Sequence, residues 1–249
     1  MKGSVRLEII NKVGYITFYH PASNSMPSGL LKKLQETIEK AGNDPAIKSI
    51  VLQSEGRTFC AGASFDELIA LKNMPQAVNF FMGFARVINT MRKTPKFIIA
   101  KVQGKAVGGG VGLIAAADYA IATGQAAVKL SELSIGIGPY VIAPAVKRKT
   151  GIAAFGEMSM NATGWYTAFW AREKGLFAQV TDDLKSLEEE TEILAEKLAG
   201  YDPLATQLLK KEIWEGTENW DSLLAEKAKI SAQLTLRDFT REKLEKFKK

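Results

Sequence analysis

The stretch Ala106-Val107-Gly108-Gly109-Gly110-Val111-Gly112-Leu113 decides the fold that we expect for this chain. An apolar run over residues 97–102 precedes it and predicts a short buried strand. A run of small apolar residues, 111–117, follows the glycines and predicts a buried helix. A strand, a glycine turn and a helix N-terminus in this order leave backbone N–H groups free to bind an anionic oxygen. The glycines are equally consistent with close packing of the helix on the strand.

Composition and charge bound the size of the core and the kind of partner. With 249 residues, 46% of them hydrophobic, the chain can bury the core of one large domain. The 33 Lys+Arg against 27 Asp+Glu give a net charge of +6, which fits a phosphate-bearing small ligand and does not favour nucleic acid. The single cysteine, Cys60, excludes an internal disulfide and indicates a reducing compartment. There is no signal-peptide pattern and no apolar run of about 18 residues, so we expect a cytoplasmic protein without membrane contact.

Apolar periodicity predicts the other elements. The chain opens with two alternating runs that predict a hairpin, and its C-terminal part has the period of amphipathic helices. The predicted strands cover residues 5–10, 15–19, 47–53, 97–102 and 119–122. The predicted helices cover residues 27–41, 77–91, 111–117, 184–198, 203–214, 222–234 and 237–249.

A second turn of small residues, Phe59-Cys60-Ala61-Gly62-Ala63-Ser64, lies about fifty residues before the glycine run. Small side chains at such a turn let the backbone approach a ligand closely. Cys60 is interpreted as a buried filler residue, and Asp66 and Glu67 as residues that cap the next helix. His20, the only histidine, precedes a proline and is predicted to be a turn residue, which argues against a histidine triad or metal site.

With these two turns in this order, the chain resembles the crotonase (enoyl-CoA hydratase/isomerase) family from about residue 5 to residue 245. The spacing from Asp118 to Ser131-Glu132, and the pattern Ala168, Ala171, Gly175-Leu176, fit the same resemblance. The resemblance implies an α/β (α+β) fold: a crotonase-like spiral of ββα units over residues 1–190 and a C-terminal helical trimerisation region over residues 191–249. It also implies an acyl-CoA thioester substrate, coenzyme A being part of the substrate and not a cofactor. The implied assembly is a homotrimer or a dimer of trimers, with no metal.

The resemblance also assigns the site. It implies that the backbone N–H groups of Ala61 and Gly109 form an oxyanion hole for the thioester carbonyl and that Glu132 is the acid/base group. Apolar neighbours would raise the pKa of Glu132, whereas the alternative role is a helix-capping glutamate after Ser131. The substrate-binding residues implied by the resemblance are Ala61, Gly62, Ala63, Ser64, Gly108, Gly109 and Pro139.

Gly112 leaves the reaction open. The family's hydratases usually carry a carboxylate there, twenty residues before the second one, whereas its mitochondrial-type isomerases shuttle a proton between C2 and C4 with one acid. The residues around Gly112 and Glu132, with Pro139 and Pro144, look more like the methylglutaconyl-CoA hydratase branch, which acts on branched, carboxylated enoyl thioesters. We therefore expect an enoyl-CoA hydratase-type lyase. A Δ3-Δ2-enoyl-CoA isomerase is the first alternative, and a non-catalytic acyl-CoA- or RNA-binding relative is the second.

Three further features bear on the substrate and the subunit contacts. The basic run of residues 147–149 could attract a second carboxylate of the substrate, although a solvated basic face is the simpler interpretation. The aromatic segment 164–170 is interpreted as a subunit contact or core. Two family contacts to CoA differ here: Ser23 lies where a basic residue usually precedes Asn24, and the chain stops at residues 247–249, which would shorten the C-terminal contact.

Overall fold

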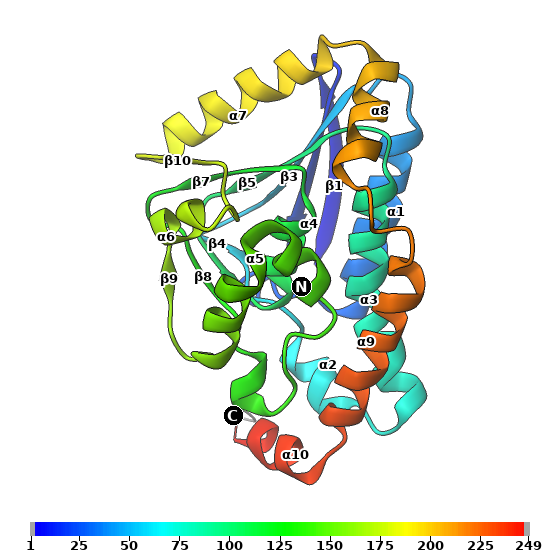
Figure 1. Cartoon of the computed structure of the whole chain (residues 1–249), viewed down its shortest axis with the longest axis vertical. Coiled ribbons are helices and arrows are strands. Elements are labelled where there is room, and N and C mark those ends of the chain that lie inside the picture. Colours follow the sequence, from blue (N-terminus) through cyan, green and yellow to red (C-terminus); the bar gives the residue numbers. More distant parts are fainter. Residues whose placement is uncertain (1–2, 247–249) are drawn as a thin grey trace.

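The computed structural model describes residues 3–246, and its strands form two sheets. The larger sheet has the order β1-β2-β3-β5-β7-β10 and the smaller has the order β4-β6-β8-β9. From β3 to β8, odd-numbered strands join the larger sheet in parallel and even-numbered strands join the smaller one. The chain thus winds as a spiral of two strands and a helix, which confirms the expected fold (Figure 1). The strands are β1 (Ser4–Ile10), β2 (Val13–Tyr19), β3 (Ser49–Ser54), β4 (Thr58–Cys60), β5 (Ile98–Val102), β6 (Lys105–Val107), β7 (Tyr119–Thr123), β8 (Ala127–Lys129), β9 (Tyr166–Thr167) and β10 (Gln179–Thr181).

The helices cover both sheets and form the C-terminal part of the chain (Figure 1). They are α1 (Ser28–Asn43), α2 (Phe65–Ala70), α3 (Met74–Lys93), α4 (Gly109–Ala116), the 3₁₀ helix η1 (Glu132–Ile135), α5 (Ala143–Met160), α6 (Ala168–Glu173), α7 (Leu184–Ala199), α8 (Pro203–Ile213), α9 (Trp220–Thr235) and α10 (Asp238–Glu245).

The central strands of the larger sheet, β3, β5 and β7, are buried on both faces and divide their side chains between two cores. In β3, Ile50 and Leu52 belong to the main core, while Val51 between them belongs to a second core under α7. Successive side chains of a strand point to opposite faces, so a continuous apolar run is what a strand covered on both sides requires. The buried face of α7 includes Leu187 and Ala195. The expected boundary at residue 190 therefore falls inside a helix that packs on the sheet.

Helix α3 is buried over more of its circumference than one amphipathic stripe predicts. The sequence predicted a stripe that includes Val78 and Phe81, but Phe80, Phe84 and Val87 are buried as well. The reason is tertiary, since α1, α4 and α9 all pack against α3. Helix α9 lies along α3 (Figure 1) and presents a stripe of small buried residues, Ala228, Ser231, Ala232 and Thr235, which allows the two helices to approach closely.

A buried ion pair joins the C-terminal helices to the larger sheet. Lys210 of α8 donates to Asp118, which directly precedes β7, with 2.8 Å between Nζ and Oδ2. Trp214 donates from Nε1 to Oδ1 of the same carboxylate at 2.7 Å, and the backbone N–H of Ile98 donates to Oδ2 at 2.7 Å. The side chains of Lys210 and Asp118 are 3% and 5% exposed. This network holds α8 against the starts of two strands, β5 and β7.

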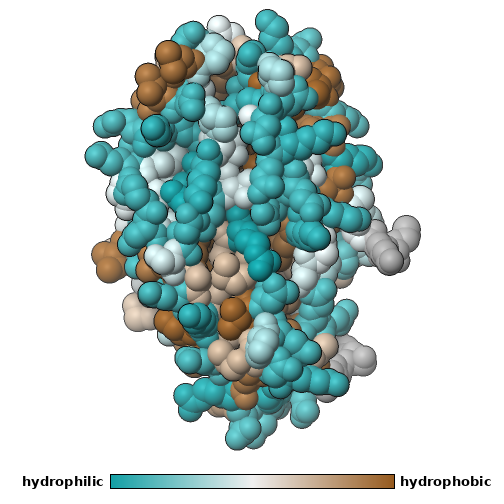
Figure 2. Space-filling view, turned by 90° about the vertical axis from the view of Figure 1, so that its right-hand side faces the viewer, coloured by the Kyte–Doolittle hydropathy of each residue, from teal (hydrophilic) through white to brown (hydrophobic). Residues whose placement is uncertain are grey.

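The outer surface of the helices carries small groups of exposed apolar side chains. The face formed by α1, α3, α8 and α9 is mostly hydrophilic, with small hydrophobic clusters (Figure 2). Exposed apolar residues on α8 include Leu204, Leu208 and Leu209. No helix within residues 3–246 is both long and apolar enough to cross a membrane. Assembly into trimers remains a prediction, and the expected shortened contact at residues 247–249 lies outside the described residues.

Candidate active site

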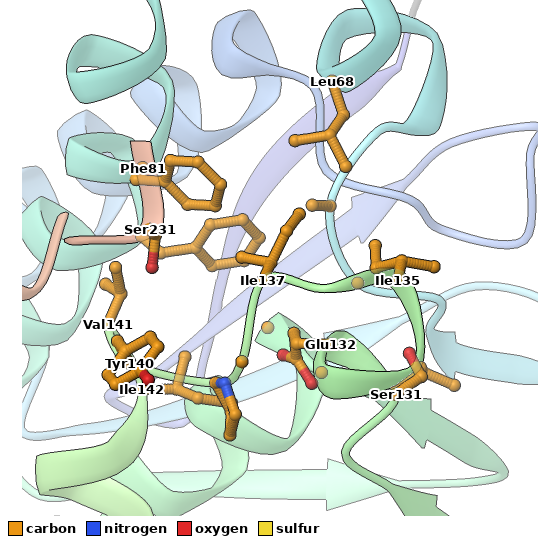
Figure 3. Close-up of a pocket in the computed structure, with 18 of the residues that line it drawn as sticks. Leu68, Phe81, Ser131, Glu132, Ile135, Ile137, Tyr140, Val141, Ile142 and Ser231 are labelled. Carbon is orange, nitrogen blue, oxygen red and sulfur yellow. The ribbon is translucent and has the colours of Figure 1, made fainter. Parts of the chain in front are cut away.

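A mostly apolar cavity lies where the two small-residue turns meet. The first turn contributes Ala61, Gly62 and Ala63, the second contributes Gly108 and Gly109, and the segment after β8 contributes Glu132 and Pro139. Figure 3 shows Glu132 in the middle of this lining, with Phe81, Ser231 and Val141 on one side and Ser131 and Ile135 on the other. The lining residues are Ala61, Gly62, Ala63, Phe65, Leu68, Phe81, Phe84, Val107, Gly108, Gly109, Ser131, Glu132, Ile135, Ile137, Gly138, Pro139, Tyr140, Val141, Ile142 and Ser231.

The glycine run forms a turn that opens helix α4 onto the cavity. Gly108 has φ +51°, a conformation that side chains rarely adopt, and its carbonyl accepts the N–H of Gly112 at 3.1 Å. Gly109 is the first residue of α4, and its own N–H has no acceptor within the described chain. The cavity therefore has one unpaired amide donor at the N-terminus of α4, as the sequence predicted.

The first turn supplies its free donor at Ala63 and not at Ala61, which corrects the expected pair. The N–H of Ala61 donates to the carbonyl of Ser23 at 3.1 Å, so it is not free to bind a ligand. The N–H of Ala63 has no acceptor in the part of the chain that the structure describes, and Ala63 lines the cavity. Gly62 between them has φ +87°, and a Cβ there would lie 2.8 Å from the carbonyl oxygen of Val107. The two turns thus touch, and their free donors are Ala63 and Gly109.

Ser64 is a helix cap and does not line the cavity, contrary to the expected substrate-binding role. Its hydroxyl accepts the backbone N–H of Glu67 and so caps α2. The carboxylate of Glu67 in turn accepts the N–H and hydroxyl of Ser28, at 2.8 and 2.7 Å. Glu67 therefore caps α1 and not its own helix. Ser64 and Glu67 therefore have structural roles beside the first turn.

The packing of the core leaves no room for a side chain at Gly109. A Cβ at Gly109 would lie 2.5 Å from Cζ of Phe84, a buried ring that also lines the cavity. We expect Gly109→Ala to lower the free energy of unfolding by about 1–3 kcal/mol, because the added methyl overpacks this contact. Denaturant unfolding measures the change, with Gly29→Ala as the control, because Gly29 has no atom near its Cβ position. Parental stability of Gly109→Ala would contradict the overpacking. A Gly109→Val protein would accordingly not report on the oxyanion hole alone.

Glu132 is the only carboxylate in the lining of the cavity as described here. Its residue is half-buried, but Oε2 is out of contact with solvent and has no hydrogen-bond partner in the described chain. A Cβ on Gly108 would lie 2.6 Å from Oε1, so the carboxylate rests directly on the glycine turn. Burial raises the pKa of Glu132 to about 7 from an ordinary value of 4.5. A carboxyl group with this pKa can both take and return a proton near neutral pH.

The raised pKa of Glu132 makes a prediction about stability. The folded chain binds the proton more tightly than the unfolded chain, so the contribution of Glu132 to stability is complete below about pH 4.5 and lost as the pH rises to about 7. Glu132→Gln removes the ionisation. We expect this variant to exceed the parent in unfolding free energy at alkaline pH by roughly 3 kcal/mol, a gap that narrows as the pH falls toward 4.5. Urea unfolding across this pH range measures the gap; a pH-independent gap would exclude a raised pKa.

Gly112 stands where the family's hydratases usually carry their first acid, and the space beside it is filled by the side chain of Ile142. A Cβ on Gly112 would lie 2.7 Å from Cβ of Ile142, a buried residue that lines the cavity. The space next to Gly112 is therefore apolar and occupied. No local sequence signal links these two residues, which lie thirty positions apart along the chain.

The cysteine, the histidine and the basic run that were considered as candidate site residues lie outside the cavity. Cys60 is buried with its pKa raised by burial to about 12, as expected for a filler residue. His20 lies in a loop, where its Nδ1 accepts the N–H of Ala22. In the basic run, Arg148 donates to the carbonyl of Ile213, and Lys149 donates to the carbonyl of Asp118 at 2.8 Å.

The aromatic segment after α5 is partly core and partly surface. Tyr166 packs on Trp170, with ring centroids 4.3 Å apart. Trp165 is exposed between the ammonium groups of Lys105 and Lys129, which lie 4.8 and 4.4 Å from its ring centroid. None of these side chains lines the cavity.

Comparison with known proteins gives one consistent result. The family model described as enoyl-CoA hydratase/isomerase matches residues 8–247. A Bacillus subtilis protein named as an enoyl-CoA hydratase/isomerase is 30% identical over 225 residues, covering 88% of this chain and 84% of its own length. A second B. subtilis protein, named as an enoyl-CoA hydratase, is 31% identical over 136 residues, so the match spans about half of each chain, 55% of this one and 53% of the other. Matches to peroxisomal bifunctional enzymes cover only 18% and 17% of those proteins.

Solved structures share the whole architecture. The crystal structure of an enoyl-CoA hydratase from Bacillus halodurans superposes with a TM-score of 0.90, covering 98% of this chain and 99% of the other. The two sequences are 22% identical, so this likeness concerns the fold.

Proposed function

Because the chain belongs to the enoyl-CoA hydratase/isomerase family, we propose that it moves a proton at carbon 2 of an enoyl-CoA thioester, with Glu132 as the acid/base group. The observation that carries this proposal is the unpaired carboxylate of Glu132, with its pKa near 7, in the same cavity as the free N–H groups of Ala63 and Gly109. A donor pair and a base are what formation of a thioester enolate requires.

The reaction that these groups serve best is migration of a double bond from C3 to C2. The Glu132 carboxylate takes the proton from C2 of a 3-enoyl-CoA, and the electron pair of that C–H bond moves into a dienolate. The negative charge on the thioester oxygen is stabilised by the N–H groups of Ala63 and Gly109, each such donor contributing roughly 3–4 kcal/mol. Protonated Glu132 then returns the proton to C4, which gives the 2-enoyl-CoA and restores the carboxylate. No other reactant is consumed.

Ile142 favours this isomerisation over hydration. Family hydratases use two carboxylates to hold and activate water, and the space that the first would occupy beside Gly112 is filled by Ile142. The described lining offers no other carboxylate to replace it. Isomerisation needs only one group that can reach both C2 and C4.

Hydration remains the second candidate because of Ser131. Its hydroxyl makes no hydrogen bond within the described chain, and the residue lines the cavity immediately before Glu132. A hydroxyl there can hold a water molecule for Glu132 to activate. The raised pKa of the free Glu132 carboxylate speaks against the third expected class, a non-catalytic binding relative.

Product analysis in isotopically labelled water separates the two reactions. The protein is incubated with 3-enoyl-CoA and 2-enoyl-CoA thioesters in water enriched in oxygen-18, and products are analysed by mass and double-bond position. We expect the 3-enoyl thioester to become the 2-enoyl thioester without uptake of label. A labelled 3-hydroxyacyl product would establish hydration instead, and the absence of any conversion would overturn both candidates.

A further inference from the structure

Ser231 places a hydroxyl without a partner in the wall of the cavity. The residue belongs to α9, is 1% exposed and lines the cavity. Within residues 3–246 its side chain makes no hydrogen bond, although its backbone carbonyl accepts from the hydroxyl of Thr235. The buried hydroxyl of Thr191 on α7 also lacks a partner within residues 3–246, whereas other helical hydroxyls, such as those of Thr150 and Ser159, donate to the carbonyl four residues back. The hydroxyl of Ser231 does not, so it stays available to the cavity.

The surroundings of Ser231 give this hydroxyl nothing polar to bind. It shares its part of the wall with Phe81 and Val141 (Figure 3), and Phe84 and Ile142 line the same cavity. All four neighbours are apolar and less than a tenth exposed. A buried hydroxyl without a partner is unfavourable, and native proteins generally satisfy such groups with protein, water or ligand. Something that enters the cavity is the remaining source of a partner.

The part of the substrate that reaches Ser231 follows from where the thioester lies. With the carbonyl oxygen at Ala63 and Gly109, the phosphates of CoA must stay in solvent, and the large apolar residues of the lining that are exposed are Phe65 and Tyr140. The opposite direction runs along α3, from Phe84 against Gly109 to Phe81 one turn earlier, and it is enclosed. Because α9 packs on α3, Ser231 lies along this enclosed path, where only the acyl tail fits.

We propose that Ser231 selects acyl-CoA substrates whose tail carries a neutral hydrogen-bonding oxygen, a ketone or a hydroxyl, in place of a plain hydrocarbon. This inference rests on the function proposed above and adds the class of acyl group to it. A serine hydroxyl can donate to a ketone and can donate to or accept from an alcohol. A site built to bond such an oxygen discriminates against the analogue that lacks it, because the hydroxyl is then left unpaired.

The charge of the cavity separates this class from carboxylated tails. The described lining contains no Lys, Arg or His, and its one ionisable carboxylate, Glu132, would repel a second. Arg148 and Lys149, which could have attracted a substrate carboxylate, are bonded to the carbonyls of Ile213 and Asp118. Burying a carboxylate without a cation is far more costly than burying a ketone. The cavity therefore favours the neutral oxygen.

A substrate series with one serine variant tests the proposal. Three sets of 3-enoyl-CoA thioesters of equal length are compared: a plain alkyl tail, tails with a ketone at successive carbons, and a tail ending in a carboxylate. We expect one ketone position to exceed the alkyl tail in kcat/KM by about tenfold, the size of one hydrogen bond, and the carboxylate to be poorest. Ser231→Ala should remove that advantage by slowing the ketone substrate alone. Ser222→Ala, an exposed serine of the same helix, should leave the preference intact.

The outcomes distinguish this proposal from the one it rests on. If all tails react and Ser231→Ala leaves their ratios unchanged, or if the parent prefers the alkyl tail, the role of Ser231 is wrong while the isomerase proposal stands. If no thioester reacts, the isomerase proposal is wrong. In that case the hydrogen bond between Ser231 and the ketone is tested by binding alone, from the affinities of saturated keto and alkyl acyl-CoAs for the parent and for Ser231→Ala. An equal affinity in both proteins would overturn it.

Discussion

Replacing Glu132 with Gln is expected to lower kcat by roughly 10²–10⁴-fold, with little change in the affinity for an unreactive acyl-CoA. The amide keeps the shape of the side chain but cannot take a proton from C2 or return one to C4. Glu132 is the only carboxylate in the described lining of the cavity, so no neighbour can replace it. Single-turnover kinetics with a 3-enoyl-CoA, together with the dissociation constant of a saturated acyl-CoA, measure the two quantities separately.

A matched control separates the chemistry from the fold. Glu67 lies close in sequence to the first turn, but its carboxylate caps α1 through Ser28 and does not line the cavity. Glu67→Gln should therefore cost stability without the loss of kcat that Glu132→Gln shows. A Glu132→Gln protein that still isomerises or hydrates at the parental rate would mean that an unidentified residue is the acid/base group.

The parts of the site that were predicted from sequence are those that depend on neighbouring residues along the chain. The glycine run could be identified as a helix N-terminus because a strand precedes it and small apolar residues follow it. The resemblance then assigned Glu132 as the candidate acid/base group, and its apolar flanks predicted the raised pKa. The structure confirms the fold that these local patterns and the resemblance predicted, and it confirms the raised pKa of Glu132.

The prediction that Ala61 supplies the donor of the first turn was wrong, because a residue far away in sequence determines which N–H group of this turn is free. Ala61 and Ala63 are the same residue type on either side of Gly62, and nothing in the sequence distinguishes their N–H groups. The difference arises when the loop at residue 23 folds back and the carbonyl of Ser23 accepts the N–H of Ala61. The pairing of a backbone group is a tertiary property, and side-chain patterns do not report it.

Two residues that line the cavity, Ile142 and Ser231, were not predicted from the sequence, because their place in the site also depends on tertiary packing. Ile142 and Ser231 come from segments thirty and about a hundred and twenty residues after the glycine run, and each enters the site only through packing. Ser231 is part of the stripe of small residues with which α9 packs on α3, and it also lines the cavity. That one residue both packs between helices and lines the cavity can be recognised only when the contact between α9 and α3 is known.

Replacing Lys210 with Met is expected to lower the free energy of unfolding by about 3–5 kcal/mol, the cost of leaving a buried charge without its partner. The carboxylate of Asp118 is buried and would keep only the N–H groups of Trp214 and Ile98 as donors. Burial lowers the pKa of Lys210 while Asp118 opposes that shift, as expected for a cation that depends on its partner. Urea unfolding of the whole chain measures the loss, and Lys211→Met, an exposed neighbour on α8, is the control.

A double-mutant cycle decides whether the ion pair or the packing of the lysine stem is responsible. Asp118→Asn removes the charge but keeps one of the two acceptor oxygens, because Trp214 and Ile98 donate to different oxygens of the carboxylate. If the pair holds α8 to the sheet, adding Asp118→Asn to Lys210→Met should recover part of the stability, and the coupling energy should exceed about 1 kcal/mol. Additive losses would show that Lys210 acts through its stem alone. Because α8 leads directly into α9, loss of the pair should also loosen the wall that carries Ser231, which hydrogen exchange of α9 amides would reveal as weaker protection.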